Sequence, residues 1–139
     1  MTKKYRLIDH TADFGIHVFG KDAADLFGNA ALALFDLLTD IRAVKGKNKR
    51  KIIVTGSDWP DLMVNWLREL LYLWNGNGLL VKAAKIQKIS AFEINATLSY
   101  DGYEPDRHVI KNEIKAVTYH QIQVARSPRD WQARIIFDV

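Results

Sequence analysis

The chain has 139 residues and a formal net charge of +4, with 48% hydrophobic and 26% charged residues. This length and balance are typical of a globular protein with one core. The absence of cysteine excludes disulfides, thiolate zinc sites, iron–sulfur ligation and cysteine nucleophiles. No apolar run reaches the ~20 residues of a membrane span, and no signal-peptide pattern opens the chain. We therefore expect one cytoplasmic domain, residues 1–139, without membrane contact.

The first part of the chain predicts two short strands and a helix. The strands are Lys3–Ile8 and Gly15–Gly20, joined by the polar segment 9–13. Asp22 has the position of an N-cap, and Asp25 follows in the capping-box position. Apolar residues then recur at helical spacing, namely Leu26, Phe27, Ala30, Leu34 and Leu37. These features predict an amphipathic helix.

A second helix follows the β-branched strand Lys51–Thr55. Asp58 is its expected N-cap, with Pro60 in the first turn, where a missing N–H costs nothing. Its polar residues form one thin stripe, so it should be covered on more than one side. The run Asn75–Gly78 should stop it, because glycine adopts the left-handed cap conformation.

The remainder of the sequence favours β-structure. Phe92–Tyr100 alternates as a half-buried strand, and Asp101-Gly102 reads as a hairpin turn. Glu113–Ala125 predicts a long strand, Ser127–Asp130 a turn, and 131–139 a last alternating strand. We expect an α+β domain in which two largely buried helices pack between or against antiparallel or mixed β-sheets.

The positive charge is concentrated in one run. Residues 42–51 carry six basic side chains and no acid, against +4 for the whole chain. The basic residues are Arg42, Lys45, Lys47, Lys49, Arg50 and Lys51. Gly46 and Asn48 favour a solvated loop for this run. The alternative is a contact for RNA or for an acidic partner.

Four stretches together resemble the archease family over essentially the whole chain. They are residues 9–16 (DHTADFGI), 66–73 (WLRELLYL), 113–120 (EIKAVTYH) and 136–139 (IFDV). Two departures from the family pattern are Arg68, where asparagine is common, and Phe14, where a small aliphatic residue is common. Neither falls on the expected metal-binding positions.

The resemblance implies a fold, a partner and a metal. It implies a sandwich fold and a non-enzymatic activator of the RtcB-type RNA-splicing ligase, which joins tRNA halves after guanylylation of its own histidine. The activator promotes guanylylation and multiple turnover, so tRNA is reached indirectly through the ligase. An older description of the family is as a chaperone. The resemblance also implies calcium bound by Asp13, Asp138 and Val139.

Asp13 and Asp138 lie far apart in the sequence, so their spacing predicts nothing by itself. If the fold brings them together, their carboxylates and a Val139 oxygen make a hard oxygen cluster suited to Ca²⁺ or another divalent cation. Without the resemblance, an Asx-type turn at Asp13 and a solvent-exposed end at Asp138 are the simpler interpretations. With the resemblance, we expect a metal site.

Other polar residues have less specific interpretations. His10 is the residue most suggestive of catalysis, because histidine titrates near neutral pH. A hydrogen bond within its turn is the simpler role, and the resemblance implies that it contacts the ligase. Lys115 is a solvated strand lysine or, by the resemblance, a second contact. His120, on the opposite strand face, should be a core or inter-strand histidine. Glu104 and Asp106, beside Arg107 and His108, should belong to a solvated loop rather than form an acid/base pair.

Three classes of function therefore compete. The ligase activator is the first, and an RNA-binding or chaperone module using the basic run is the alternative. A metal-dependent hydrolase is disfavoured, because the motifs assemble no base, nucleophile and orienting group.

Overall fold

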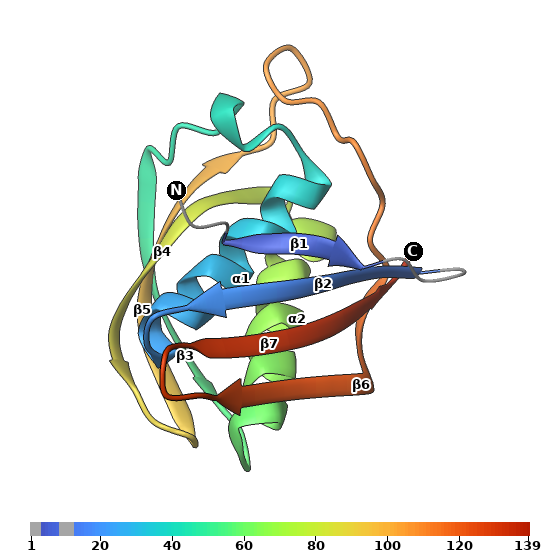
Figure 1. Cartoon of the computed structure of the whole chain (residues 1–139). Helices are drawn as coiled ribbons and strands as arrows, with labels where there is room; N and C mark the ends of the chain where they lie inside the picture. Colours follow the sequence, from blue (N-terminus) through green and yellow to red (C-terminus); the bar gives the residue numbers. More distant parts are fainter. Residues whose placement is uncertain (1–3, 9–12) are drawn as a thin grey trace.

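The computed structural model describes residues 4–8 and 13–139, which form two antiparallel sheets with two helices between them (Figure 1). Helix α1 (Ala23–Leu38) and helix α2 (Trp59–Asn77) each contact strands of both sheets. This arrangement confirms the predicted α+β class with buried helices between sheets.

The first sheet has the strand order β1-β2-β7-β6. Its strands are β1 (Tyr5–Ile8), β2 (Asp13–Gly20), β6 (Ala116–Arg126) and β7 (Trp131–Asp138). Ile16 pairs with Ile135 and Val18 with Ala133, and all four are buried against the helices. The last strand of the chain therefore lies inside the sheet, between β2 and β6.

The second sheet has the order β3-β5-β4. Its strands are β3 (Asn48–Thr55), β4 (Leu79–Ile89) and β5 (Glu93–Gly102). Ile94, Ala96 and Leu98 alternate along β5 and are fully buried, so one face of this sheet covers the helices. The other face is turned away from the core.

The helix ends follow the predicted capping residues. Asp22 accepts a hydrogen bond from the Asp25 N–H at 2.7 Å, and Asp58 accepts one from the Asp61 N–H at 2.9 Å. Gly78 caps α2 in the left-handed conformation, at φ 66°. Local sequence therefore determines where both helices begin and where α2 ends.

The core is centred on the contact between the two helices. Trp66 of α2 is fully buried, and its indole N–H donates to the Phe27 carbonyl of α1 at 3.0 Å. This hydrogen bond satisfies the polar atom of a large buried aromatic side chain. Trp59 packs on Phe27 and Trp131, with ring centroids 5.8 and 4.9 Å away.

Several predicted features need correction, and β2 begins at Asp13 rather than Gly15. Strand β4 has no counterpart among the predicted elements, because Lys82, Lys85 and Lys88 interrupt its apolar pattern. Asp101-Gly102 is not a turn but the end of β5. Strand β6 begins at Ala116 rather than Glu113, and β3 begins at Asn48 rather than Lys51. A 3₁₀ turn, η1 (Ile41–Ala43), precedes β3.

In the part of the chain that the structure describes, neither helix combines the length and the apolar character needed to cross a membrane.

Candidate functional site

Three strands meet at the corner that contains Asp13 and Asp138. Asp13 begins β2 and is the direct partner of Asp138, the last residue of β7. On the other side of β7, Asp138 pairs with Ala116, and its carbonyl accepts a hydrogen bond from the Lys115 N–H at 2.8 Å. The C-terminus lies at this end of the sheet (Figure 1). The sheet register thus joins positions from the two ends of the sequence.

Asp13 and Asp138 project from the same face of the sheet. Residues directly opposite in an antiparallel pair have Cβ atoms about 4.5–5.5 Å apart, and like charges at such positions repel. Asp13 is half-buried, while Asp138 and Val139 are exposed. A cation between the carboxylates would relieve the repulsion. The hard oxygen donors fit Ca²⁺ or Mg²⁺ better than a soft metal.

These two carboxylates would supply only part of the ligands that calcium needs. Residues 4–8 and 13–139 contain no group of three or more His, Cys, Asp or Glu side chains able to hold a metal. Ca²⁺ takes about 6–8 oxygens, so Val139, backbone carbonyls and water would have to complete the shell. His10, the predicted ligase contact, lies outside the described residues.

Lys115 lies beside the acidic pair but not on a strand. Its side chain is exposed, and it immediately precedes β6, so the predicted strand position for Lys115 was wrong. Its backbone bond to Asp138 nevertheless places it at the same corner. The corner therefore combines two acidic residues with the backbone of an exposed lysine.

His120 does not have the predicted core position. It is exposed and lies in an irregular part of β6, where pairing passes from Thr118 opposite Ile136 to Gln123 opposite Arg134. Gln121, within this bulge, has a positive φ of 54°. The alternation that placed His120 on an inner face is broken by the extra residues.

The basic run is not a loop throughout. Lys49, Arg50 and Lys51 are exposed residues of β3, whereas Lys45 and Lys47 precede the strand. The predicted solvated loop is therefore wrong for residues 48–51. The strand persists because its later residues Ile52 and Val54 pack towards the core.

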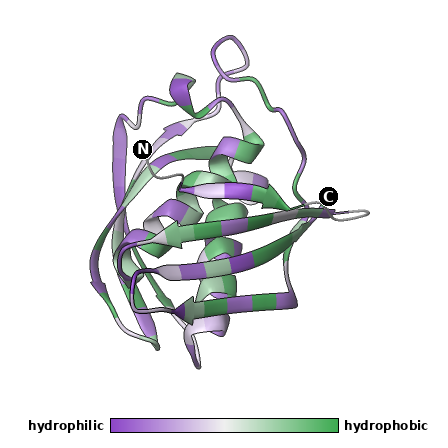
Figure 2. Ribbon diagram, viewed as in Figure 1, coloured by the Kyte–Doolittle hydropathy of each residue, from purple (hydrophilic) through white to green (hydrophobic). Residues whose placement is uncertain are grey.

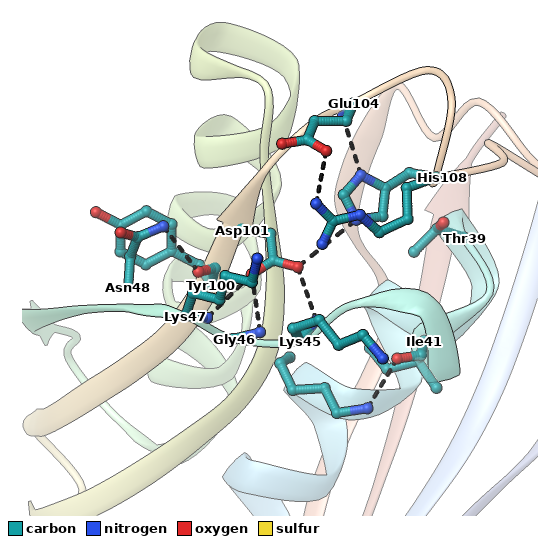
Figure 3. Close-up of polar contacts among 12 residues, drawn as sticks. Thr39, Ile41, Lys45, Gly46, Lys47, Asn48, Tyr100, Asp101, Glu104 and His108 are labelled. Carbon is teal, nitrogen blue, oxygen red and sulfur yellow. Dashed lines mark hydrogen bonds and ion pairs between the residues drawn. The ribbon is translucent and has the colours of Figure 1, made fainter.

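A buried carboxylate fixes the start of this run (Figure 3). Asp101 at the end of β5 accepts hydrogen bonds from the N–H groups of Lys45, Gly46 and Lys47 at 2.7, 2.9 and 3.0 Å. Asp101 is only 5% exposed. Gly46 has a φ of 73°, which lets three successive N–H groups converge on one carboxylate.

His108 lies on the other side of Asp101. Its Nδ1 accepts a hydrogen bond from the Glu104 N–H at 2.9 Å, and its Nε2 lies 3.6 Å from the Asp101 carboxylate. Glu104 and Asp106 are exposed, as predicted for a solvated loop, whereas the neighbouring His108 is buried. Sequence reasoning missed the Asp101–His108 pair.

Burial acts to raise the pKa of Asp101, but hydrogen bonds and a nearby charge lower it further, so the net shift is downward. The backbone N–H groups of Lys47, Lys45 and Gly46, together with the attraction of His108, hold its pKa below the usual value. Asp101 is therefore a stable anion that anchors a basic segment. In the sequence, the only indication of this turn was Gly46 between two lysines. No local pattern indicated that the turn is bound by Asp101, which lies more than 50 residues away.

The sequence of this chain matches a known protein family. The model of the archease protein family matches residues 5–139. The chain belongs to the archease protein family. A relative from Methanosarcina mazei, named protein archease, is 34% identical over 141 residues, which cover 99% of this chain and 97% of the relative. An archease from Methanopyrus kandleri is 34% identical over 135 residues, covering 95% and 96%.

Solved structures of similar proteins share the archease fold seen here. The solution structure of protein 1598 of Methanobacterium thermoautotrophicum aligns with a TM-score of 0.82 at 30% identity, covering 99% of this chain and 100% of that chain. A crystal structure from Thermotoga maritima, described as an archease and possible chaperone, aligns with a TM-score of 0.64 at 19% identity, covering 100% and 98%. The second comparison supports the fold alone.

Proposed function

We propose that this protein is a non-enzymatic activator of an RtcB-type RNA-splicing ligase and acts in tRNA splicing or RNA repair. Membership of the archease family over residues 5–139 is the observation that carries this proposal. The family resemblance implies that the activator promotes guanylylation of the ligase and its multiple turnover. We assign the contact to the corner of Asp13, Asp138 and Lys115, because the sheet register brings the backbones of these residues together.

The corner suits a transient protein contact. Asp138 and Lys115 are exposed, and three strands fix their backbones. Asp13 and Asp138 would bind a divalent cation, calcium in our proposal, from adjacent strands, with a Val139 oxygen as a further ligand. When bound, such a cation would supply positive charge between the two carboxylates. Lys115 and His10 would then contact the ligase.

The activator role depends on positioning rather than on chemistry by this chain. Guanylyl transfer is governed by the placement of phosphates and charges. A rigid corner carrying carboxylates and a lysine can orient groups of the ligase without forming a covalent bond itself. We therefore infer that the reacting groups belong to the ligase.

Multiple-turnover ligation tests this function. A purified RtcB-type ligase, GTP, metal and two RNA halves are combined with and without this protein. We expect more turnovers per ligase with the wild-type protein and loss of that gain with Asp13→Asn/Asp138→Asn. The matched control is Asp106→Asn, an exposed aspartate in the loop between β5 and β6, which should retain the gain.

A second measurement tests the metal site independently of the ligase contact. Calorimetric titration with Ca²⁺ should show binding to the wild type and to Lys115→Ala but not to the double aspartate variant. Lys115→Ala should still reduce the gain in turnover. No gain with the wild-type protein would overturn the activator role, and protection of heated ligase without faster turnover would indicate a chaperone instead. Equal calcium binding by all variants would remove the metal site.

A further inference from the structure

The outer face of the three-stranded sheet collects lysines from two strands that are distant in the sequence. Lys49 and Lys51 come from β3, and Lys85 and Lys88 come from β4. All four side chains are exposed. We call these four residues the sheet lysines. The basic run of the sequence contains only two of them.

The strand register places the sheet lysines on one face. Lys51 pairs with Thr97 of β5, and Thr97 pairs on its other side with Lys85. Lys49 pairs with Ser99, and Lys88 pairs with Asn95. Residues directly opposite share a face, and the alternate β5 residues face the core. Because strands lie about 4.8 Å apart, Lys51 and Lys85 flank Thr97 at a separation of roughly 10 Å.

Within the part of the chain that the structure describes, the sheet lysines have no carboxylate partners. Across residues 4–8 and 13–139, no ion pair involves them, and the Lys49 ammonium donates to the Ser99 hydroxyl at 2.8 Å. Two acids lie on this side of β5. Glu93 pairs with Thr55 at one end of the sheet, and Asp101 lies at the other end, where its buried carboxylate is held by the N–H groups of residues 45–47. Figure 2 shows the hydrophilic stretch of β3 at the left edge of the molecule. The Thr97 hydroxyl donates to the Gln87 side-chain oxygen at 3.1 Å. The face is therefore positively charged, and its donors are mainly the lysine ammonium groups.

The anchored turn extends this face. A Cβ added to Gly46 would lie 3.0 Å from the Ser99 Cβ, so the turn held by Asp101 rests against the outer side of β5. Its neighbours Lys45 and Lys47 are exposed. Their backbone positions are fixed, so their charges add to those of the sheet lysines without ordering a loop on binding.

Lysines alternating with hydroxyl and amide groups match a phosphate–sugar backbone. Ser, Thr and Asn side chains together with lysines make contacts of this kind to phosphates and sugars. The β5 residues of the face, Asn95, Thr97 and Ser99, are not aromatic, so the face offers no platform for stacking single-stranded bases. A three-stranded sheet is too wide for the ~12 Å major groove of B-DNA, whereas duplex RNA presents a wide, shallow minor groove with 2′-hydroxyls.

We propose that the outer face of the β3-β5-β4 sheet binds the phosphate–sugar backbone of double-stranded RNA without reading its sequence. This site is separate from the Asp13–Asp138 corner and does not depend on the proposed ligase activation. Its contacts are electrostatic, so its affinity falls steeply with salt.

Fluorescence anisotropy with a labelled RNA duplex of about 16 base pairs, the length a double-stranded RNA-binding domain spans, tests the proposal. Lys49→Gln/Lys51→Gln and Lys85→Gln/Lys88→Gln should each weaken binding about tenfold at low salt and reduce the salt slope by about two. The matched control is Lys21→Gln/Lys111→Gln, which removes two exposed lysines outside the sheet. Thermal melting checks that each variant is folded.

The result expected is weakening by both sheet pairs and not by the control. Equal weakening by the control pair would show a diffuse charge effect and overturn the proposal, as would no binding to duplex RNA at low salt. Tighter binding of single-stranded RNA or of duplex DNA would also overturn it. Displacement of the RNA by polyglutamate at equal charge concentration would assign the face to an acidic protein instead.

Discussion

Asp101 shows how one residue organises a segment far from it in the sequence. Its carboxylate accepts three backbone N–H groups from 45–47 and faces the buried His108. Each hydrogen bond to a charged group contributes about 1.5–3 kcal/mol, which offsets the cost of burying the carboxylate. The anchor determines where the basic run meets the sheet.

We predict that Asp101→Asn lowers the free energy of unfolding by about 2–3 kcal/mol near pH 7, because buried N–H donors lose an anionic acceptor. The pKa of Asp101 is lowered in the folded state, so its stabilisation is complete above the unfolded pKa of about 3.9 and is lost as the pH falls through the folded pKa. Urea denaturation from pH 2 to 7 measures both effects.

The difference in the free energy of unfolding between the wild type and Asp101→Asn should therefore become smaller as the pH falls. Asp106→Asn, at an exposed position, should change stability by less than about 0.5 kcal/mol at any pH. A gap that stays constant down to pH 2 would show that the Asp101 charge does not contribute.

At the scale of elements, the C-terminal end of α2 depends on the backbone conformation of Gly78. Gly78 has a φ of 66°, and its N–H donates to the Leu73 and Trp74 carbonyls. A Cβ added at Gly78 would meet nothing within 4 Å. The requirement for glycine here is therefore conformational and not steric.

We predict that Gly78→Ala destabilises the protein by about 1–2 kcal/mol, the cost of a left-handed conformation for a residue with a Cβ. Gly102→Ala is the control, because its added Cβ also meets nothing within 4 Å but its φ is not positive. Alanine there should be neutral or slightly stabilising. Equal midpoints for both variants in urea denaturation would contradict this explanation.

At the scale of the whole molecule, β7 links the two ends of the chain. It lies between β2 and β6, and its inner residues Ile135 and Phe137 are fully buried in the core shared with the helices. The Asp13–Asp138 pair lies at the end of this central pairing. A ligand that binds both aspartates therefore requires β2 and β7 to be paired, so it should bind only the folded sheet.

We predict that calcium raises the melting temperature of the wild type, because a ligand that binds only the folded state stabilises it. The gain is about 2.7 kcal/mol at a free calcium concentration 100 times the Kd. Asp13→Asn/Asp138→Asn should melt at the same temperature with calcium or with a chelator. Scanning calorimetry in both buffers makes the comparison, and an equal calcium shift in both proteins would place the metal elsewhere.

Local patterns in the sequence determined the helices, their caps at Asp22, Asp58 and Gly78, and the apolar faces of β2, β5 and β7. These features depend on hydrogen bonds and periodicities within a few residues, so they can be read along the chain. Strand pairing instead joins residues that the sequence separates. The meeting of Asp13 with Asp138 was expected only from the family resemblance, and the strand register places them opposite each other. The tertiary structure alone decided that Asp101 anchors 45–47 and that β4 adds its lysines to those of β3, because the register of a sheet depends on which faces the core buries.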